Sequence, residues 1–217
     1  DTMAALREAK KRGARILSIV NVVGSSIARE SDDVLYTWAG PEIAVATTKA
    51  YSTQMAVLNM LGLYFGDILG TIDRETYSEM VRDLQRVPEY IEKILESAES
   101  IHEIAKKICR SEDVFFIGRN LDYALSLEGS LKLKEISYIH SEAYASGELK
   151  HGTISLIVDG TLVIALGTYG PLFDKAMSNV VEVQARGANV LALTTESHAE
   201  EMSRHVPMVM TLSDIHD

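Results

Sequence analysis

The chain has 217 residues, enough for one large domain or two small ones with a buried core, so a peptide or a disulfide-rich mini-protein is excluded. Its net charge of −10 argues against a nucleic-acid partner, because an acidic surface repels polyphosphate. The single cysteine, Cys109, cannot form an internal disulfide or a cysteine pair for zinc or redox chemistry. We therefore expect a reducing compartment and a cytoplasmic protein.

The first third of the chain is predicted to alternate helix and strand. Residues 2–12 carry apolar side chains at helical spacing and run into Gly13, a natural helix stop. Residues 15–21 are typical of a short buried strand, and a long apolar helix is expected from about Val45 to Phe65. Its apolar stretch is too short to cross a bilayer, and no charged leader opens the chain, so no membrane association is expected.

The middle of the chain is helical and charged. Over residues 72–110 apolar side chains recur at helical spacing, and Pro88 is expected in the first turn of a helix. Residues 113–118 then predict a buried strand, followed by a loop and a further helix.

The end of the chain repeats its beginning at a constant offset of 174 residues. A helix at 173–186, the stop at Gly187 and a strand at 189–195 match the first helix, Gly13 and the first strand. The second copy is preceded by a strand at 161–166 that the first copy lacks, and the first copy continues into a helix that the second lacks. The repeat therefore predicts that both ends are truncated.

This alternation predicts an α/β fold with two tandem doubly wound parallel-sheet subdomains, helices on both faces, joined by a helical connector. The expected boundaries are 1–66 for the first subdomain, 67–110 for the connector and 111–217 for the second subdomain. In such sheets ligands bind beyond the carboxyl ends of the strands.

A charged stripe lies on the helix expected after residue 122. At 100° per residue, Glu128, Lys132 and Glu135 fall within an arc of about 60°, while leucines occupy the rest of the circumference. The stripe is either a set of surface ion pairs, each contributing about 0.2–0.5 kcal/mol, or a positioned proton carrier in a cleft. A carboxylate beside an ammonium suits aldose to ketose isomerisation, which moves one proton between adjacent carbons. The leucines predict that protein contacts this helix on most sides.

The segment 140–152 contains two histidines and two glutamates. Its spacing matches neither a zinc protease helix nor a calcium loop, so no metal is expected. His151, beside Gly152, suits acid/base work, capping or a structural role.

The small-residue loop 40–49 is the other polar segment. Thr47 or Thr48 is a good helix N-cap, or alternatively the loop approaches a small polar ligand. Neither a Walker loop nor a dinucleotide fingerprint is present, so no cofactor is expected.

Three stretches, residues 40–51, 127–140 and 142–152, resemble the sugar isomerase (SIS) domains of glutamine-dependent fructose 6-phosphate aminotransferases, also called glucosamine 6-phosphate synthases. With the repeat, the resemblance covers the whole chain. It implies an aminotransferase of amino sugar biosynthesis that condenses fructose 6-phosphate with ammonia from glutamine and isomerises the product to glucosamine 6-phosphate.

The resemblance also implies roles for four ionisable residues. Glu135 is the base that moves the proton between C1 and C2. Lys132 and Glu128 position the sugar and tune that carboxylate. His151, reaching in from a neighbouring subunit, opens the ring.

The main chain at Val45, together with Thr47, is implied to contact the sugar. A homodimer follows from the shared site. The family's phosphate loop, its C-terminal lysine and its glutaminase domain have no counterpart in this chain, so we expect the chain alone to be inactive.

Three other possibilities remain open at this point. A sugar-amine deaminase on the same scaffold would use similar residues, and a sugar-phosphate sensor would only bind its ligand. A purely structural dimerisation module would leave the charged stripe as surface decoration.

Overall fold

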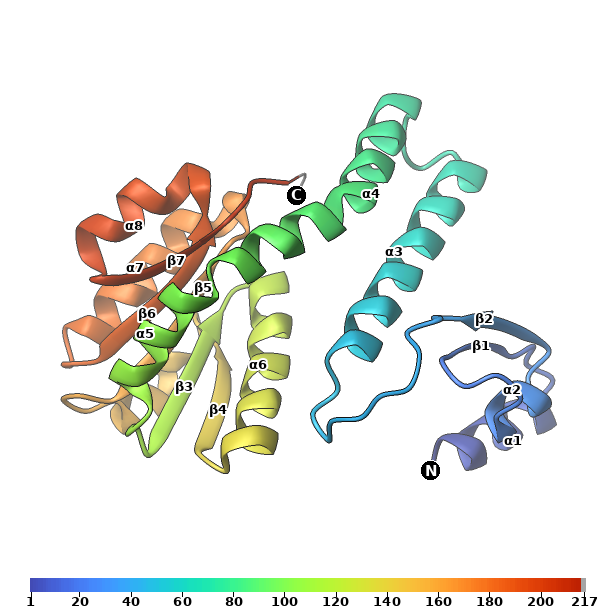
Figure 1. The fold of residues 1–217 in the computed structure, drawn as a ribbon, viewed down its shortest axis with the longest axis horizontal. Coiled ribbons are helices and arrows are strands. Elements are labelled where there is room, and N and C mark those ends of the chain that lie inside the picture. The colour runs from blue at the N-terminus through green and yellow to red at the C-terminus, as the bar shows by residue number, and fades with distance from the viewer. Residues whose placement is uncertain (216–217) are drawn as a thin grey trace. The chain divides into compact units, whose positions relative to one another are not determined.

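The computed structural model describes residues 1–215. It divides into two compact units, Asp1–Leu84 and Gln85–Asp217, which are described separately (Figure 1). The last two residues of the expected second subdomain, 216–217, lie outside the described residues. Within residues 1–215, no helix combines the length and apolar composition needed to cross a bilayer.

The first unit begins with a helix–strand repeat. Its elements are α1 (Thr2–Lys11), β1 (Leu17–Val20), α2 (Ser26–Glu30), β2 (Asp33–Tyr36) and α3 (Lys49–Leu69). The two strands pair in parallel, with Leu17 opposite Asp33. The short helix α2 is capped by Ser25, whose hydroxyl accepts a hydrogen bond from the Ala28 N–H.

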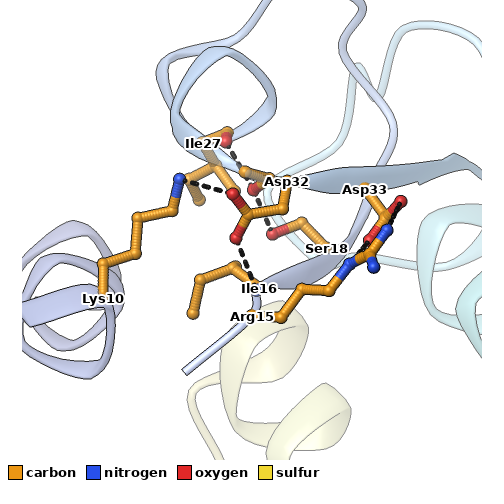
Figure 2. A network of polar contacts seen from close by, with 8 residues as sticks. Lys10, Arg15, Ile16, Ser18, Ile27, Asp32 and Asp33 are labelled. Carbon is orange, nitrogen blue, oxygen red and sulfur yellow. Dashed lines mark hydrogen bonds and ion pairs between the residues drawn. The ribbon is translucent and has the colours of Figure 1, made fainter. Parts of the chain in front are cut away.

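Two basic residues near the end of α1, Lys10 in its last turn and Arg15 after it, are paired with carboxylates (Figure 2). Lys10 Nζ lies 3.1 Å from Asp32 Oδ1, and the other oxygen of Asp32 accepts the Ile16 N–H at 2.8 Å. Arg15 makes two hydrogen bonds to Asp33, and this contact lowers the pKa of the Asp33 carboxyl. These bonds connect α1, the start of β1 and the start of β2, so Lys10 and Arg15 have a structural role here.

The long helices begin at different residues from those predicted. Helix α3 starts at Lys49 rather than near Val45, and it ends at Gly70, which takes a left-handed conformation with φ of 63°. Helix α4 (Arg74–Glu96) holds Pro88 in its interior, so the expectation of a first-turn proline is wrong. The helix begins at Arg74, 14 residues before Pro88, because the Asp73 carboxylate accepts the Thr76 N–H at 2.8 Å and caps the helix there.

The second unit contains the last part of α4 and a five-stranded sheet. The remaining elements are α5 (Ala98–Ile108), β3 (Asp113–Gly118), α6 (Leu121–Ser137), β4 (His140–Ala145), η1 (Leu149–His151), η2 (Thr153–Leu156), β5 (Leu162–Gly167), η3 (Gly170–Leu172), α7 (Phe173–Gln184), β6 (Asn189–Thr195), η4 (Glu196–His198), α8 (Ala199–His205) and β7 (Met208–Leu212). All strands run parallel in the order β4-β3-β5-β6-β7 (Figure 1). Strand β4 was not predicted, because its polar sequence lies at the sheet edge.

Helices cover both faces of this sheet, and the alternation of side chains along β3 shows how. Phe115 and Ile117 point into a core formed with α7 and α8, whereas Val114 and Phe116 contact residues of α5 and α6 on the other face. The doubly wound α/β fold predicted from the sequence is therefore confirmed. The order α7-β6-α8-β7 repeats α1-β1-α2-β2, in agreement with the 174-residue offset.

The turn from β3 into α6 requires a glycine. A Cβ at Gly118 would lie 2.4 Å from the Asp122 carbonyl carbon, so no larger residue fits. The chain therefore turns sharply at the carboxyl end of β3 and places α6 directly against the sheet.

Candidate functional site

Helix α6 is fixed to the sheet by a face of small residues, Ser126, Gly129 and Ser130. The two serines are buried, and a Cβ at Gly129 would lie 2.9 Å from the Phe116 ring, so the helix backbone packs closely on β3. The Ser130 and Ser141 hydroxyls lie 2.7 Å apart, and Ser141 also donates to the Ser130 carbonyl at 2.9 Å. These contacts attach α6 to β3 and β4 and set the rotation of the helix about its axis.

The charged stripe of α6 forms a connected trio. Lys132 Nζ donates to Glu135 Oε2 at 2.6 Å and lies 3.4 Å from Glu128 Oε1. The side chains of Glu128, Lys132 and Glu135 are 25%, 21% and 28% exposed, so none of them extends into bulk water. Such partial shielding strengthens a charge-assisted hydrogen bond.

Lys132 keeps its charge in this arrangement. The hydrogen bond to Glu135 raises the pKa of Lys132, desolvation opposes that rise, and the bond to Glu128 adds to it. The result is a protonated ammonium held between two carboxylates. This trio can hold one carboxylate in a fixed orientation toward a ligand.

Most large apolar side chains of α6 are exposed in this chain, although the sequence predicted that protein contacts the helix on most sides. Only Leu133 among its large apolar residues is packed against a core cluster. The small-residue face accounts for the inner contacts. The other large apolar side chains of α6 remain 43–67% exposed in this chain: Leu121, Leu125, Leu127, Leu131 and Ile136.

His151 lies at the end of the short helix η1, in the same unit as the trio. Leu149, which is 1% exposed, anchors η1 in the core, whereas His151 is exposed. Among residues 1–215 no other side chain or backbone group bonds to the His151 ring. The ring is therefore exposed, and its role stays a prediction.

The other histidine of this segment, His140, is engaged on the sheet edge. Its Nδ1 lies 2.7 Å from Asp113 Oδ1, and its Nε2 lies 3.6 Å from Glu142 Oε1. Glu142 also accepts a short hydrogen bond from the Tyr144 hydroxyl, which raises the pKa of Tyr144 to about 12. Over the described part of the chain, no group of three or more His, Cys, Asp or Glu side chains is arranged to hold a metal ion.

The loop 40–48 belongs to the first unit. Ala46 is buried, Thr47 is half-buried, and the Val45 side chain is 90% exposed. Thr48 occupies the N-cap position of α3, but its side chain makes no capping bond. A threonine therefore stands at the N-cap as expected, but its hydroxyl does not cap the helix, and the Thr48 N–H donates to Glu42 Oε1 at 3.0 Å.

Two carboxylates with clear positions in the structure were not singled out from the sequence. Glu42 is one of them. The other is Asp122, which is 2% exposed and accepts hydrogen bonds from the Thr168 N–H at 3.0 Å, the Thr168 hydroxyl at 2.5 Å and the Tyr169 N–H at 3.2 Å. Asp122 thus connects the start of α6 to the loop after β5. An acidic residue in the first turn of a helix was the only sequence signal for it.

A cavity of about 380 Å³ lies within the second unit, near the carboxyl ends of β5, β6 and β7. None of the trio residues lines it. Most of its lining is apolar, and it consists of Val87, Tyr90, Ile91, Ile94, Leu121, Asp122, Leu125, Thr168, Tyr169, Thr195, Leu212, Ser213 and Ile215.

The predicted site residues thus fall into two groups. The structure brings Glu128, Lys132 and Glu135 together on α6, and His151, whose ring has no partner among residues 1–215, lies in the same unit. Val45 and Thr47 lie on a loop of the other unit. A single pocket containing both groups stays a prediction.

Comparison with known proteins identifies relatives of the whole chain. The glutamine–fructose-6-phosphate aminotransferase (isomerizing) of Clostridium tetani is 58% identical over 90% of this chain and 32% of its own length. That of Clostridium acetobutylicum is 51% identical over 100% of this chain and 36% of its own length. The chain spans about a third of the length of these curated relatives.

A solved structure has the same fold. The C-terminal domain of glucosamine-fructose-6-phosphate aminotransferase from Francisella tularensis superimposes with a TM-score of 0.93 and 35% identity, over 98% of this chain and 60% of that one. The resemblance inferred from the sequence motifs is thus confirmed. The model of one family, the SIS domain, matches residues 1–64 and 107–211. The chain therefore belongs to the SIS domain family.

Proposed function

We propose that this chain is the isomerase part of a glutamine–fructose-6-phosphate aminotransferase. The names of its relatives support this activity over a sensor or a deaminase. The observation that carries the proposal is the α6 trio, in which the Lys132 ammonium lies 2.6 Å from Glu135 and 3.4 Å from Glu128.

The proposed substrate is fructose 6-phosphate, and the nitrogen comes from glutamine as ammonia. Ammonia adds to the C2 ketone of the open-chain sugar, water leaves, and a C2 imine forms. A proton then leaves C1 and one is delivered to C2, while the C1 hydroxyl gives up its proton and the imine nitrogen gains one, so that the imine becomes an amine and the C1 hydroxyl becomes an aldehyde. No hydrogen is gained or lost, and the product is glucosamine 6-phosphate.

Glu135 is the proposed base for this proton transfer, because one carboxylate above the C1 to C2 bond can perform both halves of it. Lys132 fixes the orientation of Glu135 through its hydrogen bond, and Glu128 holds Lys132 from the other side. The free, exposed ring of His151 suits the opening of the sugar ring, in which one proton is taken from the anomeric hydroxyl and one is given to the ring oxygen.

The remaining parts of the proposal concern binding and assembly. The backbone of Val45 and the side chain of Thr47 contact the sugar. His151 acts on the substrate of a neighbouring subunit, so the working protein is a homodimer. A glutaminase domain of the same polypeptide supplies the ammonia, and the protein works in the cytoplasm.

The test is the Glu135→Gln substitution in a full-length protein that carries this sequence. We expect glucosamine 6-phosphate formation to fall by about 10²–10⁴-fold, because general base catalysis contributes that much, while glutamine hydrolysis continues. Glu112→Gln is the matched control, since Glu112 is exposed and outside the trio.

Deuterium incorporation from solvent gives a second measurement. The wild type should exchange a hydrogen at C1 or C2 of the sugar, and Glu135→Gln should not. Equal synthesis rates for the wild type and Glu135→Gln would refute the role of Glu135. Binding of fructose 6-phosphate without any turnover by the wild type would favour a sensor instead.

A further inference from the structure

Glu42 carries an unusual buried oxygen. Among residues 1–215, its Oε2 is the one buried side-chain nitrogen or oxygen that has no hydrogen-bond partner. Buried polar atoms are nearly always paired, because a missing hydrogen bond costs about 1–3 kcal/mol. An unpaired carboxylate oxygen at this position therefore needs an explanation.

The other oxygen of Glu42 holds the start of α3. Oε1 accepts the Thr48 N–H at 3.0 Å and lies 3.4 Å from the Thr48 hydroxyl. A carboxylate at the N-terminus of a 21-residue helix is also stabilised by the helix dipole. The Glu42 side chain thus closes a loop from residue 42 to residue 48. The hydrogen bond at Oε1 fixes the position of the carboxylate, while Oε2 has no partner among residues 1–215.

The closed loop contains backbone N–H groups that have no protein acceptor among residues 1–215. The backbone N–H groups of residues 43–47 bond to no acceptor among the residues that the structure describes. The side chains of Ile43 and Val45 are 93% and 90% exposed, and only Ala46 is buried. Within the described part of the chain, an oxygen without a protein donor therefore lies in the same loop as five N–H groups without a protein acceptor.

We infer that Glu42 is a positioning residue for sugar binding by this loop. When the phosphosugar binds, a backbone N–H of residues 43–47 donates to Glu42 Oε2, and the loop becomes fixed at two points instead of one. The other N–H groups and the Thr47 hydroxyl then face the hydroxyls of the sugar. Because Oε2 is buried, Glu42 acts through the loop and does not touch the sugar itself. This inference rests on the proposed function.

Two substitutions separate the two oxygens. Glu42→Gln keeps a carbonyl oxygen to accept the Thr48 N–H but replaces Oε2 by an NH₂ group, which cannot accept a hydrogen bond. Glu42→Ala removes both contacts. Glu8→Gln is the matched control, because Glu8 is an exposed acid of the same unit that is paired with Arg12.

The first measurement is the kinetics of glucosamine 6-phosphate formation in the full-length protein. We expect Glu42→Gln to raise the KM for fructose 6-phosphate about tenfold and to leave kcat within about threefold, because loss of one charge-assisted hydrogen bond weakens binding by about that factor. Glu42→Ala should raise KM at least as much and also lower the melting temperature. Glu8→Gln should change neither constant.

The second measurement is hydrogen–deuterium exchange of the amides of residues 43–47, with and without fructose 6-phosphate. The sugar should protect these amides in the wild type and in Glu8→Gln but not in Glu42→Gln. Wild-type KM and wild-type protection in Glu42→Gln would overturn the inference. A hundredfold fall in kcat at unchanged KM would also overturn it, since Glu42 would then act on the reacting atoms.

The outcome for the wild type separates this inference from the proposed function. If the wild type makes glucosamine 6-phosphate and Glu42→Gln has the same KM and the same amide protection as the wild type, only the inference about Glu42 fails. If the wild type neither binds nor converts fructose 6-phosphate, the proposed function fails and the inference fails with it.

Discussion

Gly129 offers a direct test of how α6 is held against the sheet. In Gly129→Ala the new methyl carbon would lie 2.9 Å from Phe116 Cε1 and 3.2 Å from Phe116 Cδ1. Carbon atoms in ordinary contact are about 3.5–4.0 Å apart, so the methyl group is about 0.6 Å too close. Phe116 is 8% exposed and cannot move away freely, so the helix must shift or the ring must leave its preferred position.

The expected size of the effect follows from two opposing contributions. Overpacking of a core costs about 1–3 kcal/mol, whereas replacement of a helical glycine by alanine stabilises by about 1 kcal/mol. Gly62 in α3 provides the control, because a Cβ there meets nothing within 4 Å and Gly62→Ala gains only the helix propensity. The free energies of unfolding of Gly129→Ala and Gly62→Ala should therefore differ by about 1–3 kcal/mol.

Urea unfolding of the two variants and of the wild type measures this difference. The double variant Phe116→Leu/Gly129→Ala should lose less stability than the sum of its single variants, since leucine lacks the ring carbons that clash. Because α6 carries the trio, Gly129→Ala should also lower kcat in the full-length protein. If the two glycine variants agree within about 0.5 kcal/mol, close packing of α6 on Phe116 is refuted.

Two further predictions concern buried or shielded polar groups. Asp122→Asn should lower the free energy of unfolding by about 1–3 kcal/mol, because an NH₂ group would face a donor of Thr168 or Tyr169. Urea unfolding measures this loss, with the exposed Asp174→Asn as the control. Equal urea midpoints for the two variants would contradict the prediction. The raised pKa of Tyr144 means that its bond to Glu142 stabilises the fold fully below pH 10 and loses this effect as the pH rises to about 12. The absorbance difference at 295 nm between the wild type and Tyr144→Phe should accordingly titrate near pH 12, and a midpoint near 10 would exclude the bond.

The sequence predicted those parts of the fold that depend on local apolar patterns. Strand β6 occupies residues 189–195 as expected, and the repeat correctly related the two helix–strand pairs. The sequence did not predict strand β4, whose residues pair with a neighbouring strand on only one side. It also did not predict the start of α4, which depends on the Asp73 cap. Elements on the edge of a sheet and helix ends depend on single hydrogen bonds more than on periodicity.

The candidate site shows the same division. Helical spacing alone placed Glu128, Lys132 and Glu135 on one face, and the structure joins them by ion pairs. Asp122 and Glu42 were not predicted, because their partners are distant in sequence or lie in an irregular loop. Asp122 bonds to residues 46 and 47 positions further along the chain, a distance over which no periodic pattern exists.

The small-residue face of α6 has a consequence for how this protein can evolve. Ser126, Gly129 and Ser130 hold the helix backbone against β3 and β4, so the coordinates of the trio follow from the main chain. Mutations at the outward-facing Leu127 and Leu131 can therefore accumulate by drift without moving the carboxylates, whereas a bulkier residue on the inner face displaces all three charges at once. The geometry of the trio therefore tolerates a change of side chain on the outer face of the helix better than one on its inner face.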